Sequence, residues 1–290
     1  MMVPELSLER ITAMLPATRA RWIAMCFFGM SFALLSTAAM AEPSANPWPS
    51  NESPGLSLLS AASDSGRYSY VFFWKDQTDA TQRRLEAFSS AVKAIAEQAD
   101  AVTVCVTDPK EKATVDAFKV ARAPMPLVVA VAPNGAITKA WTTPFTSEVA
   151  KEGLVSEGTA ACLKALQDDK LVLVSVQNES TARSSEAIQA ALGFLEDPRF
   201  SESAELVVIN PSNQAEEKFL ADLKVQPAPS EAVTLVLAPP GRTVVKFVGA
   251  VSAKEIITKV TDAAAGCCPD GKCGPGQCCP GGKCGPTQKK

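Results

Sequence analysis

The residues best suited to chemistry lie in a cysteine-rich tail at the end of the sequence. Residues 267–288 are two copies of one eleven-residue unit, Cys-Cys-Pro-Asp-Gly-Lys-Cys-Gly-Pro-Gly-Gln, and the second copy differs only at Gly281 and Thr287. Six thiols follow from this repeat: Cys267, Cys268, Cys273, Cys278, Cys279 and Cys284. Because Gly, Pro and Lys fill most of the remaining positions, the tail buries no core, and only cross-links or a metal ion can order it.

Three interpretations of these thiols stay open. An even number of cysteines outside the cytoplasm is typical of disulfides. Thiolates on flexible turns also suit a soft metal, Cu(I) or Zn(II), although the gaps differ from the Cys-x₂-Cys spacing of ordinary zinc sites. The third interpretation is a redox arm that exchanges disulfides with other proteins. Lys272 and Lys283 each place a positive charge beside a thiol, which favours the last two. No other cofactor is indicated.

The composition excludes several functions. The chain has no histidine, which removes Ser-His-Asp, Cys-His and histidine-ligated zinc mechanisms. Its formal net charge of −3 gives no basic surplus for holding phosphates, so no nucleic-acid partner is expected.

The first 41 residues are typical of a secretory signal. Arg19 and Arg21 precede an apolar run over 22–35, and Ala39-Met40-Ala41 resembles an A-x-A cleavage site. We therefore expect an exported protein, periplasmic or extracellular. It would be held at a membrane only if this segment stays uncleaved as an anchor.

The elements that follow form two similar blocks. Residues 42–66 are rich in Pro, Ser and Asn and predict a linker without a core. The first block, 67–168, predicts strands over 68–74, 101–107, 127–132 and 136–141, with helices over 85–95, 112–120 and 159–167. The second block, 169–265, predicts strands over 171–176, 205–210, 233–238 and 243–249, with helices over 184–195, 215–225 and 252–264. Residues 266–290 form the tail.

Short identities support a duplication of these blocks. Lys119-Val120 and Ala123-Pro124 recur 105 positions later as Lys224-Val225 and Ala228-Pro229. Strand-helix-strand-helix-strand-strand-helix, twice over, predicts two tandem α/β sandwiches with mixed sheets.

The blocks resemble the thioredoxin-fold superfamily, on Phe73-Trp74 at a strand end and on Val120-Ala121-Arg122-Ala123-Pro124, which is similar to the family's Val-x-x-x-Pro motif. The resemblance implies a cis proline before the hairpin strands. Pro124 and Pro126 both fit in the first block. The repeat favours Pro124, because only that proline recurs, as Pro229.

The resemblance also implies a Cys-x-x-Cys pair that begins four residues after the tryptophan. Here those positions are Thr78 and Thr81, and the second block has no cysteine at its corresponding turn. An alcohol forms neither a thiolate nor a disulfide, so both domains are expected to be redox-inactive. The resemblance to the non-catalytic modules of protein disulfide isomerase implies a polypeptide or protein partner.

These observations favour a non-enzymatic binding or scaffold protein. The alternative is a thiol-disulfide oxidoreductase that uses the tail cysteines. Two further cysteines, Cys105 and Cys162, are expected to be buried small hydrophobes, or else to form one helix-to-sheet disulfide.

Overall fold

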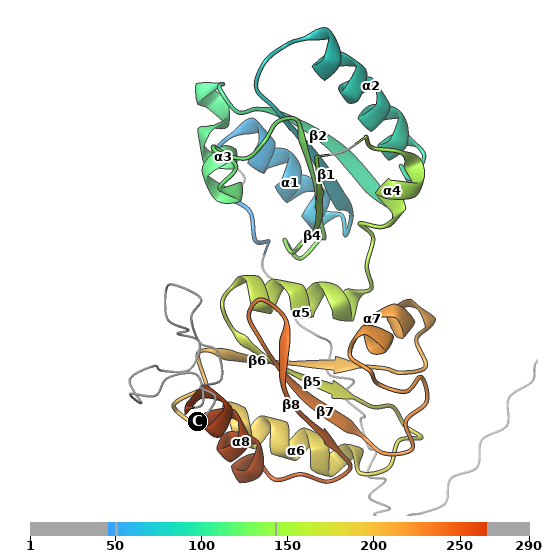
Figure 1. The fold of residues 1–290 in the computed structure, drawn as a ribbon, viewed down its shortest axis with the longest axis vertical. Helices are drawn as coiled ribbons and strands as arrows, with labels where there is room; N and C mark the ends of the chain where they lie inside the picture. The colour runs from blue at the N-terminus through green and yellow to red at the C-terminus, as the bar shows by residue number, and fades with distance from the viewer. Residues whose placement is uncertain (1–45, 50–51, 143, 266–290) are drawn as a thin grey trace, which may run out of the picture. The chain divides into compact units, whose positions relative to one another are not determined.

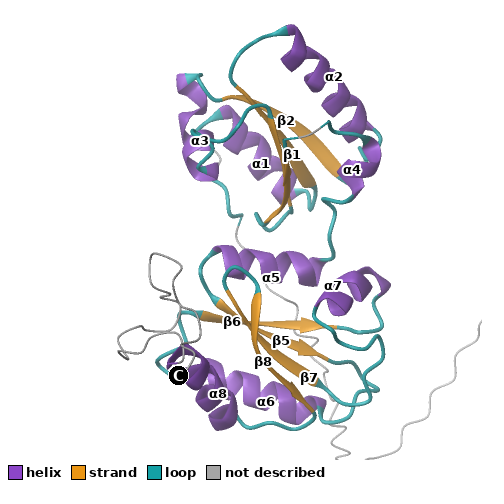
Figure 2. Cartoon of the chain, in the orientation of Figure 1, coloured by secondary structure: helices purple, strands orange, loops and turns teal. Residues whose placement is uncertain are grey.

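The computed structural model describes residues 46–49, 52–142 and 144–265. The expected signal segment and the cysteine-rich tail both lie outside these residues. Within them the chain forms two four-stranded sheets, each with helices on both faces (Figure 1; Figure 2).

The first domain is built on the sheet order β2-β1-β3-β4. Its elements are α1 (Pro54–Asp64), β1 (Tyr68–Trp74), α2 (Asp79–Lys93), β2 (Ala99–Cys105), the 3₁₀ turn η1 (Pro109–Glu111), α3 (Lys112–Phe118), β3 (Leu127–Val131), β4 (Ile137–Trp141) and α4 (Ser147–Lys151). Strands β1 and β2 are parallel, and β3 runs antiparallel to both β1 and β4.

The second domain repeats this plan with the order β6-β5-β7-β8. Its elements are α5 (Glu157–Gln167), β5 (Leu171–Val176), α6 (Ser184–Leu195), β6 (Ala204–Ile209), η2 (Gln214–Glu216), α7 (Glu217–Asp222), β7 (Val233–Ala238), β8 (Arg242–Val248) and α8 (Ala253–Ala265). Strands β5 and β6 are parallel, and β7 is antiparallel to β5 and β8. A parallel strand pair followed by an antiparallel hairpin, between two helical layers, is a thioredoxin-like fold, so the predicted fold class is confirmed.

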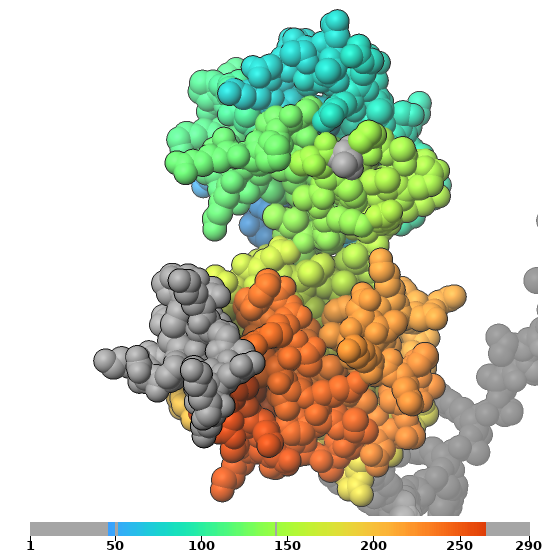
Figure 3. All heavy atoms as spheres, in the orientation of Figure 1, coloured from blue at the N-terminus to red at the C-terminus, as the bar shows by residue number. Residues whose placement is uncertain are grey.

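Successive side chains of a central strand point to opposite faces of the sheet, and in these strands both sets are apolar. Each sheet is therefore covered by helices on both faces. In β1, Val71 and Phe73 join the apolar cluster under α1 and α3, whereas Tyr70 and Phe72 join the cluster under α2 and α4. Strand β5 is buried at every position, as expected of a strand with both faces covered. The side chains of the first domain form a continuous surface from the blue-green to the green part of the chain in the space-filling view (Figure 3).

The expectation of a linker over 42–66 is wrong for its second half, which forms helix α1. The Ser53 side chain accepts a hydrogen bond from the Leu56 amide, and Pro54 occupies the first turn, where its missing N–H costs nothing. Leu56 and Leu59 are each only 1% exposed. Pro54, one of the residues that indicated a linker, therefore lies in the first turn of a helix that packs in the core of the first domain.

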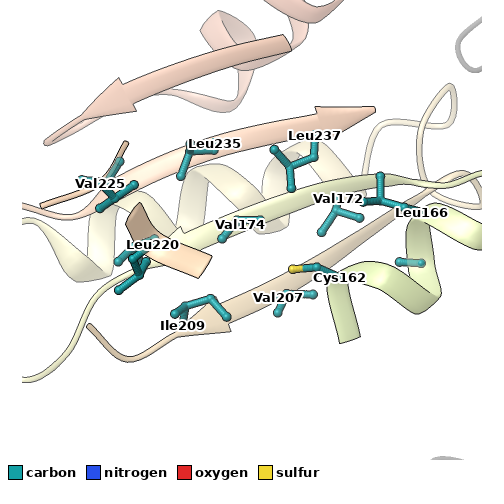
Figure 4. Close-up of a cluster of buried hydrophobic side chains, with 13 residues drawn as sticks. Cys162, Leu166, Val172, Val174, Val207, Ile209, Leu220, Val225, Leu235 and Leu237 are labelled. Atoms are coloured by element: carbon teal, nitrogen blue, oxygen red, sulfur yellow. The ribbon is translucent and has the colours of Figure 1, made fainter. Parts of the chain in front are cut away.

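The helix expected to close the first block belongs instead to the second sheet. Cys162 and Leu166 of α5 pack in the core cluster with Val172 of β5 (Figure 4). The first block is closed by the short helix α4, where Ala150 is buried and accepts a hydrogen bond from the Tyr70 hydroxyl. The expected boundary between residues 168 and 169 therefore cuts α5 from the sheet that it covers.

The duplication is clear in backbone conformation. Lys119 and Lys224 follow α3 and α7 with φ of 54° and 55°, in the left-handed region that ends many helices. Gly135 and Gly241 both have positive φ in the turns between the hairpin strands.

Candidate functional site

The candidate site lies where β1 ends and β3 begins. Phe73 pairs with Leu127 across these two strands, so Trp74 and Pro126 leave the sheet at the same edge. On the other side of β1, Trp74 pairs with Cys105 at the end of β2. The turn before α2 follows the carboxyl end of β1, and the loop before β3 lies at the same end of the sheet because β3 runs antiparallel to β1. In α/β proteins, ligands usually bind at the carboxyl ends of the parallel strands.

Helix α2 begins at the first of the two expected degenerate redox positions. Thr78 is the N-cap, and its hydroxyl oxygen accepts a hydrogen bond from the Thr81 amide at 3.1 Å. The two hydroxyl oxygens lie 3.1 Å apart. Thr78 is exposed and Thr81 is partly exposed. A helix N-terminus lowers the pKa of a thiol placed there, but these alcohols have no thiolate to stabilise.

The second domain carries an equivalent pair that the sequence interpretation missed. Thr181 and Ser184 precede and open α6 with the same spacing, 103 positions after Thr78 and Thr81. The same offset relates Tyr68, which begins β1, to Leu171, which begins β5. The pair could therefore have been found in the sequence by comparing positions 103 residues apart. It was missed because the proline motif repeats at a different offset, 105 residues.

The prolines differ from expectation. Among the described residues the cis peptide bonds are Met125–Pro126 and Pro239–Pro240. The preference for Pro124, and its counterpart Pro229, is therefore wrong, and Pro126 is the proline that directly precedes β3. The Ala-Pro repeat misled because it lies upstream of the strand; the residue directly before β7 is Ala232.

The loop before β3 presents an open backbone edge. Met125 is partly buried, with its side chain against the cluster that contains Val120 and Leu127. Within the described chain, neither its N–H nor its C=O takes part in a hydrogen bond. A partly exposed donor and acceptor on one residue can pair with an extended chain.

The two described cysteines do not form the disulfide that the sequence allows. Both are free, Cys105 partly exposed and Cys162 buried. Figure 4 shows the Cys162 sulfur among apolar side chains of β5 and β6. Burial raises the pKa of the Cys162 thiol from its ordinary 9.0 to about 12, and the charges of Glu216 and Glu205 add to the shift. Cys162 is therefore a neutral core residue, as expected.

Two carboxylates are buried in the described chain, one in each domain. Glu111 is 7% exposed and accepts from the Gly55 amide at 3.1 Å. Glu216 is 3% exposed and accepts from the Gly158 amide at 3.1 Å. Each carboxylate caps the first helix of its own domain, where the helix dipole favours negative charge. Their role is therefore structural, and they add no acid or base to the site.

Within the described residues no group of three His, Cys, Asp or Glu side chains is placed to hold a metal ion. None of the described helices is both long and apolar enough to cross a membrane. The six tail cysteines proposed as disulfide or metal ligands lie outside the described residues.

No protein-family model and no curated protein matches the chain. Similar solved structures include human ERp44, 11% identical with a TM-score of 0.31, where 70% of this chain is covered and the chain spans about half (53%) of that protein. The first two thioredoxin domains of Saccharomyces cerevisiae Eps1p are 11% identical with a TM-score of 0.29, covering 73% of this chain and 97% of theirs. StoA from Bacillus subtilis is 19% identical with a TM-score of 0.23, covering 30% and 81%. Likeness at this level supports no inference about function, and the fold assignment rests on the strand order above.

Proposed function

We propose that this chain is an exported, non-enzymatic binding protein whose first thioredoxin-like domain holds an extended polypeptide segment along Met125. The observation that carries the proposal is the open N–H and C=O of Met125, beside a helix start that bears hydroxyls in place of thiols.

The chemistry of this edge favours a polypeptide ligand. A backbone donor and acceptor on one extended residue match the acceptor and donor of a second chain, as in strand addition. Such pairing uses hydrogen bonds to the backbone of the bound segment and therefore tolerates many different side chains. This suits a protein that binds varied polypeptides. Trp74 and Met125 are both partly exposed and offer apolar contact to side chains of the bound segment.

The absence of catalysis is inferred from the available groups. Thr78 and Thr81 cannot exchange disulfides, and Cys162 is buried with a raised pKa. Cys105 is partly exposed and free, and its sulfur lies 3.2 Å from the Thr107 hydroxyl.

Export and the role of the tail are part of the same proposal. The tail cysteines, from Cys267 to Cys284, would be cross-linked or would hold Cu(I) or Zn(II) once the signal is removed. The oxidoreductase alternative is separable by insulin reduction with the mature chain, with and without truncation after Ala265. Turnover that disappears on truncation would establish the alternative and end the non-enzymatic proposal.

The binding site can be tested by trapping. A Thr78→Cys variant is mixed with an unstructured peptide of Ser, Thr and Val whose single cysteine is activated as a thionitrobenzoate disulfide. The thiolate introduced at position 78 attacks the peptide sulfur, the new disulfide joins the two chains, and thionitrobenzoate leaves with the electron pair. A peptide held along Met125 raises the local concentration, so we expect trapping about tenfold or more faster than at a remote cysteine.

The control is Ser65→Cys. Ser65 is exposed and follows α1 just before the start of β1, so it provides a thiol at the opposite end of the sheet from the loop. Each trapping rate is divided by the rate of the same variant with free cysteine activated as a thionitrobenzoate disulfide, which corrects for differences in thiol reactivity. Peptide mapping by mass spectrometry separates both positions from the native cysteines, and equal corrected rates at positions 78 and 65 would refute the proposed site.

A further inference from the structure

Two hydroxyl side chains in the core of the second domain have no hydrogen-bond partner in the described part of the chain. Ser175 of β5 and Thr234 of β7 are both 0% exposed, and neither hydroxyl oxygen makes a hydrogen bond. The side-chain amide oxygen of Gln177 is also buried without a partner. Because a buried polar group without a partner is costly, native proteins satisfy nearly all such groups with protein atoms or with ordered water.

The two hydroxyls lie side by side on one face of the sheet. Ser175 and Thr234 are directly opposite each other in the antiparallel pair of β5 and β7, where facing Cβ atoms are about 4.5–5.5 Å apart. Leu173 and Val236, each two residues away along its strand, pack in the apolar cluster with α6 and α8. Alternate side chains of a strand share a face, so both hydroxyls point toward these helices. The Gln177 amide continues the β5 ladder by donating to the Ile209 carbonyl at 3.0 Å, which puts the Gln177 side chain on the same face.

Small side chains leave room for a water molecule at this place. Helix α6 connects the parallel strands β5 and β6 and runs antiparallel to them, so its first turns cover the carboxyl end of β5. The buried residue nearest the start of α6 is Ala187. In the first domain the corresponding strand pair is Phe72 and Val128, and the Phe72 ring packs on Phe88 of α2 with ring centroids 5.3 Å apart. A water molecule, which takes up about 30 Å³ in the liquid, needs less space than these rings.

We infer that the second domain binds one ordered water molecule between its sheet and α6, at a place that the first domain fills with aromatic rings. The water bridges the hydroxyl oxygens of Ser175 and Thr234 and donates its remaining hydrogen bond to the Gln177 amide oxygen, which gives it the three partners that are typical of a buried water. All three atoms are oxygens of neutral side chains, so they suit water better than a divalent cation, which prefers carboxylates. The inference does not depend on the proposed function.

A crystal structure of the full chain, at a resolution that shows ordered water, tests the site without any variant. We expect a density peak within hydrogen-bond distance, about 2.5–3.2 Å, of both the Ser175 and the Thr234 hydroxyl oxygens. A direct hydrogen bond between these two hydroxyls, or the absence of such a peak, would overturn the inference.

A second test counts long-lived water molecules in solution, by oxygen-17 relaxation dispersion of the solvent. The double variant Ser175→Ala/Thr234→Val should hold one long-lived water fewer than the native chain. The matched control is Ser53→Ala/Thr114→Val, because this buried pair of the first domain has its two hydroxyl oxygens 2.6 Å apart and bonded to each other. The control should keep the native count, and circular dichroism checks that both variants are folded. An unchanged count in the Ser175/Thr234 variant, or the same loss in both variants, would overturn the inference, and the crystal structure decides if either variant fails to fold.

Discussion

At the scale of single residues, the two buried glutamates show how side chains that look surface-like in sequence become structural. In the second domain the Glu216 carboxylate accepts from the Ser156 hydroxyl at 2.5 Å, the Gly158 amide at 3.1 Å and the Thr159 hydroxyl at 3.3 Å. A Cβ added at Gly158 would lie 2.6 Å from the same carboxylate and 2.2 Å from Ile209. The glycine therefore lets the carboxylate approach the helix backbone.

Replacing this carboxylate should destabilise the folded chain. Glu216→Gln keeps the size but replaces one acceptor oxygen with a donor that faces other donors. We expect a loss of about 1–3 kcal/mol in the free energy of unfolding, measured by urea denaturation. The control is Glu217→Gln, because the neighbouring Glu217 is exposed and its change should stay within about 0.5 kcal/mol. Equal effects at the two positions would contradict the capping role.

The Cys162 thiol should make stability depend on pH in the alkaline range. Its pKa is raised from 9.0 to about 12 in the folded chain, so between these values the unfolded state binds fewer protons and unfolding is favoured as pH rises. The contribution is fully present below pH 9 and is lost above it. Between about pH 8 and pH 10 the stability of the native chain should fall by about 1 kcal/mol relative to Cys162→Ala.

This comparison uses the difference between two chains so that the tyrosines and lysines cancel. Cys105→Ala serves as a second reference, since it removes a partly exposed thiol. A difference between the native chain and Cys162→Ala that stays the same across this pH range would show that the Cys162 thiol does not keep its proton on folding.

At the scale of elements, helix α1 is the clearest departure from the sequence expectation. Leu59 is 1% exposed and packs in the core under β1, whereas its neighbour Leu58 is 53% exposed. Asn46, which precedes α1 in the chain, also binds to this helix. Its side-chain amide donates to the Ser60 carbonyl at 2.9 Å and to the Asp64 carboxylate at 2.8 Å. The segment before β1 is therefore part of the first domain.

Adjacent leucines provide a matched test of α1. Leu59→Ala should lower the free energy of unfolding by about 2–5 kcal/mol, because it leaves a cavity in a packed core. Leu58→Ala should change it by less than about 0.5 kcal/mol. Chemical denaturation of both variants decides the point, and a small effect at Leu59 would restore the interpretation of this segment as a linker.

At the scale of the whole molecule, the position of α5 decides where one domain ends and the next begins. The expected boundary at 168/169 would leave the second sheet without Cys162, Ala165 and Leu166, which fill its core. It would also leave the Glu216 carboxylate buried without its donors.

Two fragments test this boundary. Residues 154–265 contain α5 with its N-cap Ser156 and should unfold cooperatively. Residues 169–265 should show no cooperative transition, because the lost apolar burial is comparable with the whole stability of a small domain, about 5–15 kcal/mol. Far-UV circular dichroism during urea titration measures both. Cooperative unfolding of the shorter fragment would place α5 with the first domain.

Much of the fold was predictable because local signals are strong where a side chain's neighbours are close in sequence. The four predicted hairpin strands match β3, β4, β7 and β8 to within one residue at each end, and turns rich in Pro and Gly, Pro133–Gly135 and Pro239–Gly241, lie between them. The predicted helix over 252–264 matches α8, and Ser252, directly before it, accepts a hydrogen bond from the Glu255 amide at 3.2 Å. The strands were found because β-branched and aromatic residues concentrate in them.

The sequence by itself determined the class of fold, the repeated order of elements and the hydroxyl side chains of Thr78 and Thr81 at the start of a helix, since these depend on residue types and local periodicity. Only the tertiary structure decided which sheet α5 covers and which proline, bonded in cis, directly precedes β3. Each of these depends on pairing between segments distant in sequence, and backbone hydrogen bonds and apolar burial carry no local signature of their partner. The same periodicity suits a helix to either sheet, and the three-dimensional packing alone selects one.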